Sequence, residues 1–102
     1  LKIKGSNKRY LLEVDINNIP KEGVLILKGN RIGIFNFKES FYVLSLKCTH
    51  LGCTVNVTEY KIVCPCHGSE FDLTGKVLKG PANKALSICS FELKDDKIIV
   101  YG

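Results

Sequence analysis

The sequence CTHLGC at residues 48–53 is followed, after residues 54–63, by CPCHGS at residues 64–69. These two boxes hold four of the five cysteines and both histidines of the chain. Thiolate sulfur and imidazole nitrogen bind zinc, copper and iron, so their concentration here predicts a metal site. Cys48 with His50, and Cys64 with His67, each predict a short loop that presents one thiolate and one imidazole.

The residues alone leave the metal open. Zinc is the usual occupant of closely spaced cysteine and histidine, but a structural zinc needs only four ligands, and the boxes offer six candidates. Zinc fingers favour C-x₂₋₄-C pairs, whereas these boxes read C-x-H-x-x-C and C-x-C-H. One cysteine and one histidine on each of two loops fit a [2Fe–2S] cluster with two cysteines on one iron and two histidines on the other.

The two boxes resemble those of Rieske iron–sulfur proteins, specifically the disulfide-containing kind found in quinol–cytochrome c reductases and the photosynthetic plastoquinol complex. The sequence GPA at residues 80–82 follows at the spacing of that family. With its strand-like flanks, the resemblance covers nearly the whole chain. It implies a Rieske [2Fe–2S] cluster whose ligands are Cys48 and Cys64 on one iron and His50 and His67 on the other.

The resemblance also implies that Cys53 and Cys66 form a disulfide between the two loops. This leaves Cys89 as the fifth cysteine, which we expect to be a buried core thiol beside Phe91 on the same strand face. The alternative for Cys53 and Cys66, two buried free thiols, is disfavoured because loop tips are exposed.

Further roles follow from the resemblance. Leu51 is expected to be an exposed apolar tip that enters the quinol pocket of a partner, although a packed leucine is the alternative reading. Ser69 is expected to donate a hydrogen bond to a bridging sulfide. Pro81 belongs to a loop that covers the third side of the cluster, or to a simple turn. Phe71 stands where the family often has a tyrosine whose hydroxyl bonds a ligand sulfur.

The glycines and histidines of the boxes carry two more expectations. Gly52 and Gly68 are expected to let the backbone come close to the cluster and turn its amides toward the sulfides. Imidazole bound to ferric iron is a stronger acid than free imidazole, so His50 and His67 are expected to couple proton uptake to electron uptake as the catalytic pair.

Composition limits the other functions. The net charge is +5, but the 15 basic residues are scattered, and no stacked aromatics are interleaved with arginine, so nucleic acid is not an expected partner. The sequence contains no run of 18 apolar residues, so it predicts no membrane-spanning helix. A disulfide indicates an extracytoplasmic compartment, so we expect a soluble head on the periplasmic face, held there by a missing N-terminal anchor or by partner subunits.

The strand pattern predicts one all-β domain, residues 1–102, built as an antiparallel barrel or sandwich. A base of residues 1–46 and 83–102 is expected to carry a cluster-binding subdomain at residues 47–82. Hairpins are predicted at Gly29-Asn30 and across residues 94–96, and a central strand at residues 41–46. The first strand is placed at residues 8–14, and no repeats are evident.

The resulting hypothesis is a subunit of a quinol–cytochrome c oxidoreductase, which accepts electrons from quinol and works with cytochrome b and c-type cytochrome subunits. Three alternatives remain: the small subunit of an arsenite-oxidase-like molybdenum enzyme, a soluble Rieske ferredoxin, and a zinc-stapled β module without redox activity. The ferredoxins lack the pair at Cys53 and Cys66.

Overall fold

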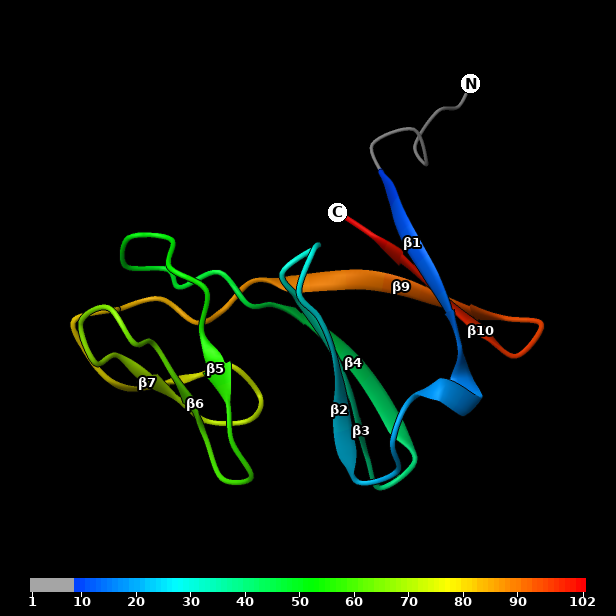
Figure 1. The fold of residues 1–102 in the computed structure, drawn as a ribbon, viewed down its shortest axis with the longest axis horizontal. Helices are drawn as coiled ribbons and strands as arrows, with labels where there is room; N and C mark the ends of the chain where they lie inside the picture. Colours follow the sequence, from blue (N-terminus) through cyan, green and yellow to red (C-terminus); the bar gives the residue numbers. More distant parts are fainter. Residues whose placement is uncertain (1–8) are drawn as a thin grey trace. The chain divides into compact units, whose positions relative to one another are not determined.

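The computed structural model describes residues 9–102, and Lys8, which we placed in the first strand, lies outside the described residues. Ten strands and one 3₁₀ turn occur within residues 9–102 (Figure 1). The elements are β1 (Tyr10–Asp15), η2 (Ile16–Asn18), β2 (Gly23–Leu27), β3 (Ile32–Phe37), β4 (Ser40–Ser45), β5 (Asn56–Val57), β6 (Ile62–Val63), β7 (Glu70–Phe71), β8 (Val77–Lys79), β9 (Ile88–Lys94) and β10 (Lys97–Tyr101). The all-β prediction is confirmed. No helix in the described part is long and apolar enough to cross a membrane.

The chain divides into two compact units. The base unit comprises the chain up to Val43 together with Cys89–Gly102, and the loop unit comprises Leu44–Ile88. The strands form a sheet in the order β1-β10-β9-β4-β3-β2 and a smaller sheet in the order β5-β6-β7-β8. β4 lies between β9 and β3, as expected for a strand that is apolar on both faces.

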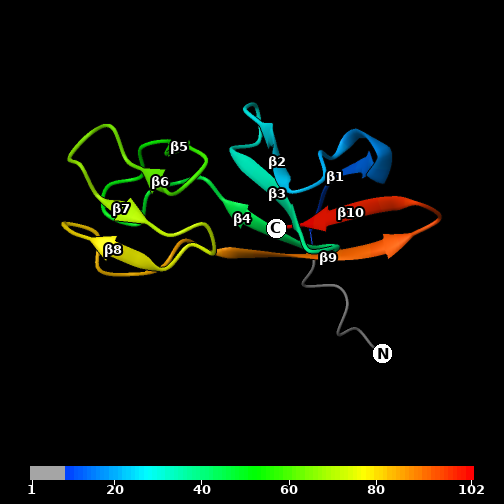
Figure 2. The same cartoon turned by 90° about the horizontal axis from the view of Figure 1, so that it is seen from below.

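Two-residue turns join neighbouring strands of the large sheet. Lys38-Glu39 and Asp95-Asp96 each have positive φ at both residues, the type I′ geometry that matches the twist of a hairpin. The β9–β10 hairpin across the second turn is visible in Figure 2 and confirms the predicted last hairpin, although β9 begins at Ile88. The predicted turn at Gly29-Asn30 is only partly correct: the positive φ falls on Arg31, and the connection between β2 and β3 runs from Lys28 to Arg31.

The core of the base unit lies on one face of its strands. Ile32, Ile34 and Val43 pack with Ile98 and Val100, and all five are at least nine-tenths buried. On the opposite face of β3 and β4, Phe35 stacks on Tyr42 with ring centroids 4.8 Å apart. Alternation along β3 therefore buries both of its faces.

Cys89 packs against this base-unit core together with Phe91, as the strand pattern predicted. The thiol is half-buried, so the expectation of a buried core thiol is only partly correct. The difference follows from the position of Cys89 at the start of β9, between the exposed Ile88 and Ser90. Burial still raises the pKa of the Cys89 thiol above its ordinary value.

Candidate metal centre

The two boxes fold into loops with the same backbone hydrogen bonds. In loop 1 (Cys48–Cys53) the N–H of Cys48 donates to the carbonyl of Cys53 at 2.7 Å, and that of Gly52 donates to the carbonyl of Cys48 at 2.8 Å. In loop 2 (Cys64–Ser69) the corresponding bonds are Cys64 to Ser69 at 2.8 Å and Gly68 to Cys64 at 3.0 Å. The sequence analysis missed this short structural repeat, because the boxes share only their first and fifth letters.

Strand pairing extends the correspondence beyond the loops. Lys47 pairs with Thr54 across loop 1, and Val63 pairs with Glu70 across loop 2. Each loop is therefore the closed end of a short antiparallel ladder. Cys48 and Cys64 occupy equivalent first positions, where the ladder enters the loop.

Gly52 and Gly68 explain how the loops turn so tightly. Their φ angles are +86° and +82°, a region in which a side chain would be strained. The N–H of each glycine donates to the carbonyl of the first cysteine of its own loop, which closes the turn. That the loop backbone turns amides toward the sulfides stays a prediction.

The sulfur and nitrogen donors of the predicted site differ in exposure. Cys48 and Cys64 are free thiols, and each is only 2% exposed. His50 and His67 are exposed, and their ring centroids lie 5.2 Å apart with the ring planes at 85°. The loops thus bring both imidazoles together at the surface and keep both thiols inside.

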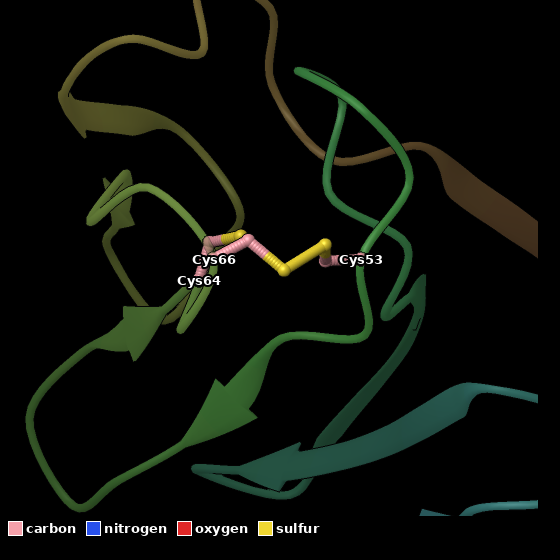
Figure 3. A group of neighbouring side chains, drawn as sticks. All are labelled: Cys53, Cys64 and Cys66. Carbon is pink, nitrogen blue, oxygen red and sulfur yellow. A yellow bond between two sulfur atoms is a disulfide. The ribbon is translucent and has the colours of Figure 1, made fainter.

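The remaining two cysteines form the predicted disulfide, which Figure 3 shows between the loops. Its two sulfurs, from Cys53 and Cys66, lie with the sulfur of Cys64 in a group within 4.8 Å of one another. Three neighbouring sulfurs suggest a metal site, but disulfide sulfurs are not thiolates and do not serve as such ligands. Only Cys64 of these three remains available to a metal.

A third segment, residues 80–84, is hydrogen-bonded to both loops. The fully buried hydroxyl oxygen of Ser69 accepts a hydrogen bond from the N–H of Ala82 at 2.9 Å. The hydroxyl of Thr49 donates to the carbonyl of Lys84 at 2.6 Å. Pro81, which precedes Ala82, is exposed.

Sequence reasoning found Ser69 and the GPA segment that contains Ala82, but missed Thr49 and Lys84. No local pattern marks a bond between Thr49 and a backbone carbonyl 35 residues further along the chain. Because Ser69 uses an oxygen lone pair toward Ala82, its hydroxyl hydrogen stays free for a second partner. The structure therefore leaves the expected donor to a sulfide in place.

The surroundings of the donors are apolar on one side and cationic on another. Leu51, between the exposed His50 and the disulfide, is 69% exposed, so the packed-leucine reading is wrong. A cavity of about 440 Å³ beside His50 is also lined by Lys47 and Lys84. Phe71 is fully buried in the loop unit.

These residues suit the predicted cofactor. Once the disulfide has taken two cysteines, the boxes leave two buried thiols and two exposed imidazoles, one of each from equivalent loops. Two thiolates and two imidazoles are the ligand set of a Rieske [2Fe–2S] centre, in which histidines replace two cysteines on one iron. The same four donors also satisfy tetrahedral zinc, so the geometry of the loops does not decide between the two metals.

Comparison with known sequences decides between the two metals. The Rieske [2Fe-2S] domain family matches residues 10–94. The cytochrome b6-f complex iron-sulfur subunit of Cyanothece sp. (strain PCC 7425) is 52% identical over 59 residues, which cover 56% of this chain and 33% of that protein. The corresponding subunit of Nostoc punctiforme is 51% identical over 61 residues, covering 58% and 34%. The chain spans about a third of the length of these curated relatives.

Solved structures of Rieske proteins have a similar fold. The cyanobacterial plasma membrane Rieske protein PetC3 from Synechocystis PCC 6803 has a TM-score of 0.63 and 34% identity, over 78% of this chain and 84% of that one. A hyperthermophilic respiratory Complex III has a TM-score of 0.72 and 28% identity, over 85% and 72%. A ferredoxin of carbazole 1,9a-dioxygenase from Nocardioides aromaticivorans, with a TM-score of 0.64 and 16% identity, shares the fold. On the family match over most of its length, the chain belongs to the Rieske [2Fe-2S] domain family.

Proposed function

We propose that this chain is the electron-transfer domain of a quinol–cytochrome c oxidoreductase, where it accepts electrons from quinol and passes them to a c-type cytochrome. Cytochrome b and c-type cytochrome subunits would be its partners, on the periplasmic face of the membrane. The observation that carries the proposal is the arrangement of donors, with buried Cys48 and Cys64 behind exposed His50 and His67.

We assign Cys48 and Cys64 to one iron and His50 and His67 to the other. When bound, the [2Fe–2S] cluster supplies one-electron chemistry at a potential that neutral imidazole ligands raise above that of all-cysteine clusters. Burial of the thiols keeps water from their sulfurs, whereas the exposed imidazoles are within reach of a docked molecule. The ring nitrogen of His50 or His67 that does not hold the iron is therefore the group that, in its deprotonated form, would accept a hydrogen bond and then the proton from a quinol hydroxyl.

Leu51 supports docking to a quinol-binding partner. It is an exposed apolar side chain at a loop tip, next to one of the paired histidines, and such tips commonly mark binding surfaces. The disulfide between Cys53 and Cys66 favours this function over that of a soluble Rieske ferredoxin, because the ferredoxins that the boxes otherwise resemble lack it.

The experiment uses the assembled oxidoreductase with Leu51→Ala in this chain, and Tyr60→Ala as its control. Tyr60 is 82% exposed and lies in the turn between β5 and β6 of the same unit. We expect Leu51→Ala to slow quinol-dependent cytochrome c reduction at least tenfold without changing the cluster spectrum, and Tyr60→Ala to leave the rate unchanged. Equal rates in both variants and the parent would overturn the proposed docking; quinol oxidation that persists without this chain would overturn the function.

Ser69→Ala is expected to lower the midpoint potential of the cluster. Loss of a hydrogen bond to a charged group costs about 1.5–3 kcal/mol, which corresponds to roughly 60–130 mV for one electron. The substitution also leaves the N–H of Ala82 without its acceptor, so the thermal midpoint should fall as well. Potentiometric titration and thermal unfolding measure both effects, and the exposed Ser87→Ala is the control. An unchanged potential would show that the Ser69 hydroxyl has no partner on the cluster.

Phe71→Tyr is expected to raise the potential. Hydrogen bonds to cluster sulfurs favour the reduced state, and the added hydroxyl restores the donor that relatives with tyrosine have. Phe71 is fully buried, so the hydroxyl has to find a partner inside the loop unit. The matched control is Phe37→Tyr on β3 of the base unit, which should leave the titration curve in place. Coincident curves for Phe71→Tyr and the parent protein would rule out the absence of the tyrosine hydroxyl as a determinant of the potential.

A further inference from the structure

The base unit contains a cavity that the electron-transfer function does not use. Its volume is about 620 Å³, within the range of about 300–1,000 Å³ usual for small-molecule sites. The apolar part of its wall comes from η2 and the segment after it, through Ile16, Ile19 and Pro20, and from Phe41 at the start of β4. Ile19 also belongs to the core, so the cavity extends one end of the core outward.

A buried amide without a partner forms part of this wall. Asn36 is 8% exposed and lines the cavity, and among residues 9–102 no group hydrogen-bonds to its side chain. Residues of one strand face follow every second position, so Asn36 continues the face of Ile32 and Ile34, which point into the core. An apolar residue is expected there. Buried polar groups almost always have hydrogen-bond partners, and an orphan among them calls for a ligand or a water molecule.

The mouth of the cavity is acidic. Glu22 and Glu39 line it, with Lys21 as the one cationic group among the lining residues. Glu22 is fixed in place, because its carboxylate accepts a hydrogen bond from the N–H of Lys38 at 2.6 Å. Two carboxylates against one ammonium disfavour an anionic ligand at this mouth.

We propose that this cavity binds a small neutral molecule that carries a carboxamide or lactam group on an apolar ring. The Asn36 carboxamide has a donor and an acceptor side by side, and an amide or lactam edge satisfies both at once. The apolar ring then lies against Ile16, Ile19 and Phe41, whereas a carboxylate of the same shape lacks the donor and meets the acidic mouth.

The test titrates the oxidised, cluster-loaded protein with benzamide and with benzoate, which match in shape, and follows backbone amide resonances. Benzamide is expected to shift resonances of residues 16–22 and 36–41, and benzoate to bind at least tenfold more weakly. Asn36→Leu should weaken benzamide binding about tenfold or more, because it removes both hydrogen bonds. The control variant is Asn83→Leu, exposed and in the loop unit, which should bind benzamide as the parent does.

Two further measurements keep the test decisive. Without ligand, Asn36→Leu is expected to raise the melting temperature, as the loss of an unsatisfied buried amide should. Should that variant fail to fold, Glu39→Gln replaces it and should narrow the preference for benzamide over benzoate. Equal binding of the two probes, the absence of shifts at residues 16–22 and 36–41, or undiminished benzamide binding by Asn36→Leu would each show that only water fills the cavity.

Discussion

The Cys48→Ser protein is expected to be colourless after purification, with no iron, no inorganic sulfide and no paramagnetic signal after reduction. Iron–sulfur clusters depend on thiolate ligands, and this thiol is one of only two free, buried cysteines in the described chain. Cys64→Ser should give the same result, because Cys64 occupies the equivalent position in loop 2 and is equally buried. Metal analysis, visible absorption and paramagnetic resonance of protein purified without air measure the loss.

Cys89→Ser is the matched control for this prediction. It changes the same side chain, but in the base unit, where Cys89 packs beside Phe91. We expect full iron and sulfide content and a small change in stability. Stoichiometric iron and sulfide in Cys48→Ser would contradict the assigned ligand set, and stoichiometric zinc in the parent protein would contradict the cofactor.

Removal of the disulfide should have the next largest effect. The double variant Cys53→Ser/Cys66→Ser opens a loop whose ends are 13 residues apart. The added conformational entropy of the unfolded chain should lower the free energy of unfolding by about 3 kcal/mol. In cluster-free protein this predicts a fall in melting temperature of roughly 12–24 °C, at 4–8 °C per kcal/mol for a small domain. In cluster-loaded protein the fall should be smaller, because a cluster held by the proposed ligands would link the same two loops.

The disulfide should also govern how long the cluster survives. Without it, the loops can separate and admit water and chelator to sulfurs that are otherwise buried. We expect visible colour to fade several times faster in the double variant when a ferrous chelator is added. A thiol reductant should accelerate fading in the parent protein and leave the double variant unaffected. This difference would show that the reductant acts on cluster loss through the Cys53–Cys66 disulfide. Identical fading and melting in both proteins would contradict a structural role for the disulfide.

The chemistry of the loops could be predicted because it depends on cysteine and histidine, which have few other uses when they stand at such short spacing. Paired cysteine and histidine at short spacing indicated a metal site, and family resemblance supplied the pairing of Cys53 with Cys66, which the structure confirms. The hairpin at Asp95-Asp96 was predictable in the same way, because aspartate tolerates positive φ.

Other features depend on contacts that no local pattern records. Gly29-Asn30 offered two residues suited to positive φ, yet the β2–β3 register places that conformation on Arg31. The half-burial of Cys89 reflects its place at the beginning of β9, and no local pattern fixes where that strand starts. The bond from Thr49 to the carbonyl of Lys84 joins segments that only the folded chain brings together.

The shared hydrogen bonding of the two loops has a consequence for how this centre is encoded. His50 is the third residue of loop 1 and Cys66 the third of loop 2; Leu51 and His67 are the fourth residues. Loops with the same backbone hydrogen bonds therefore present an imidazole and a leucine at the third and fourth positions of loop 1, and a disulfide sulfur and an imidazole at those positions of loop 2. The proposed ligands of the two irons therefore differ through side chains on two loops that share their backbone hydrogen bonds, so exchanging these side chains is expected to change the ligand set more than the loop conformation.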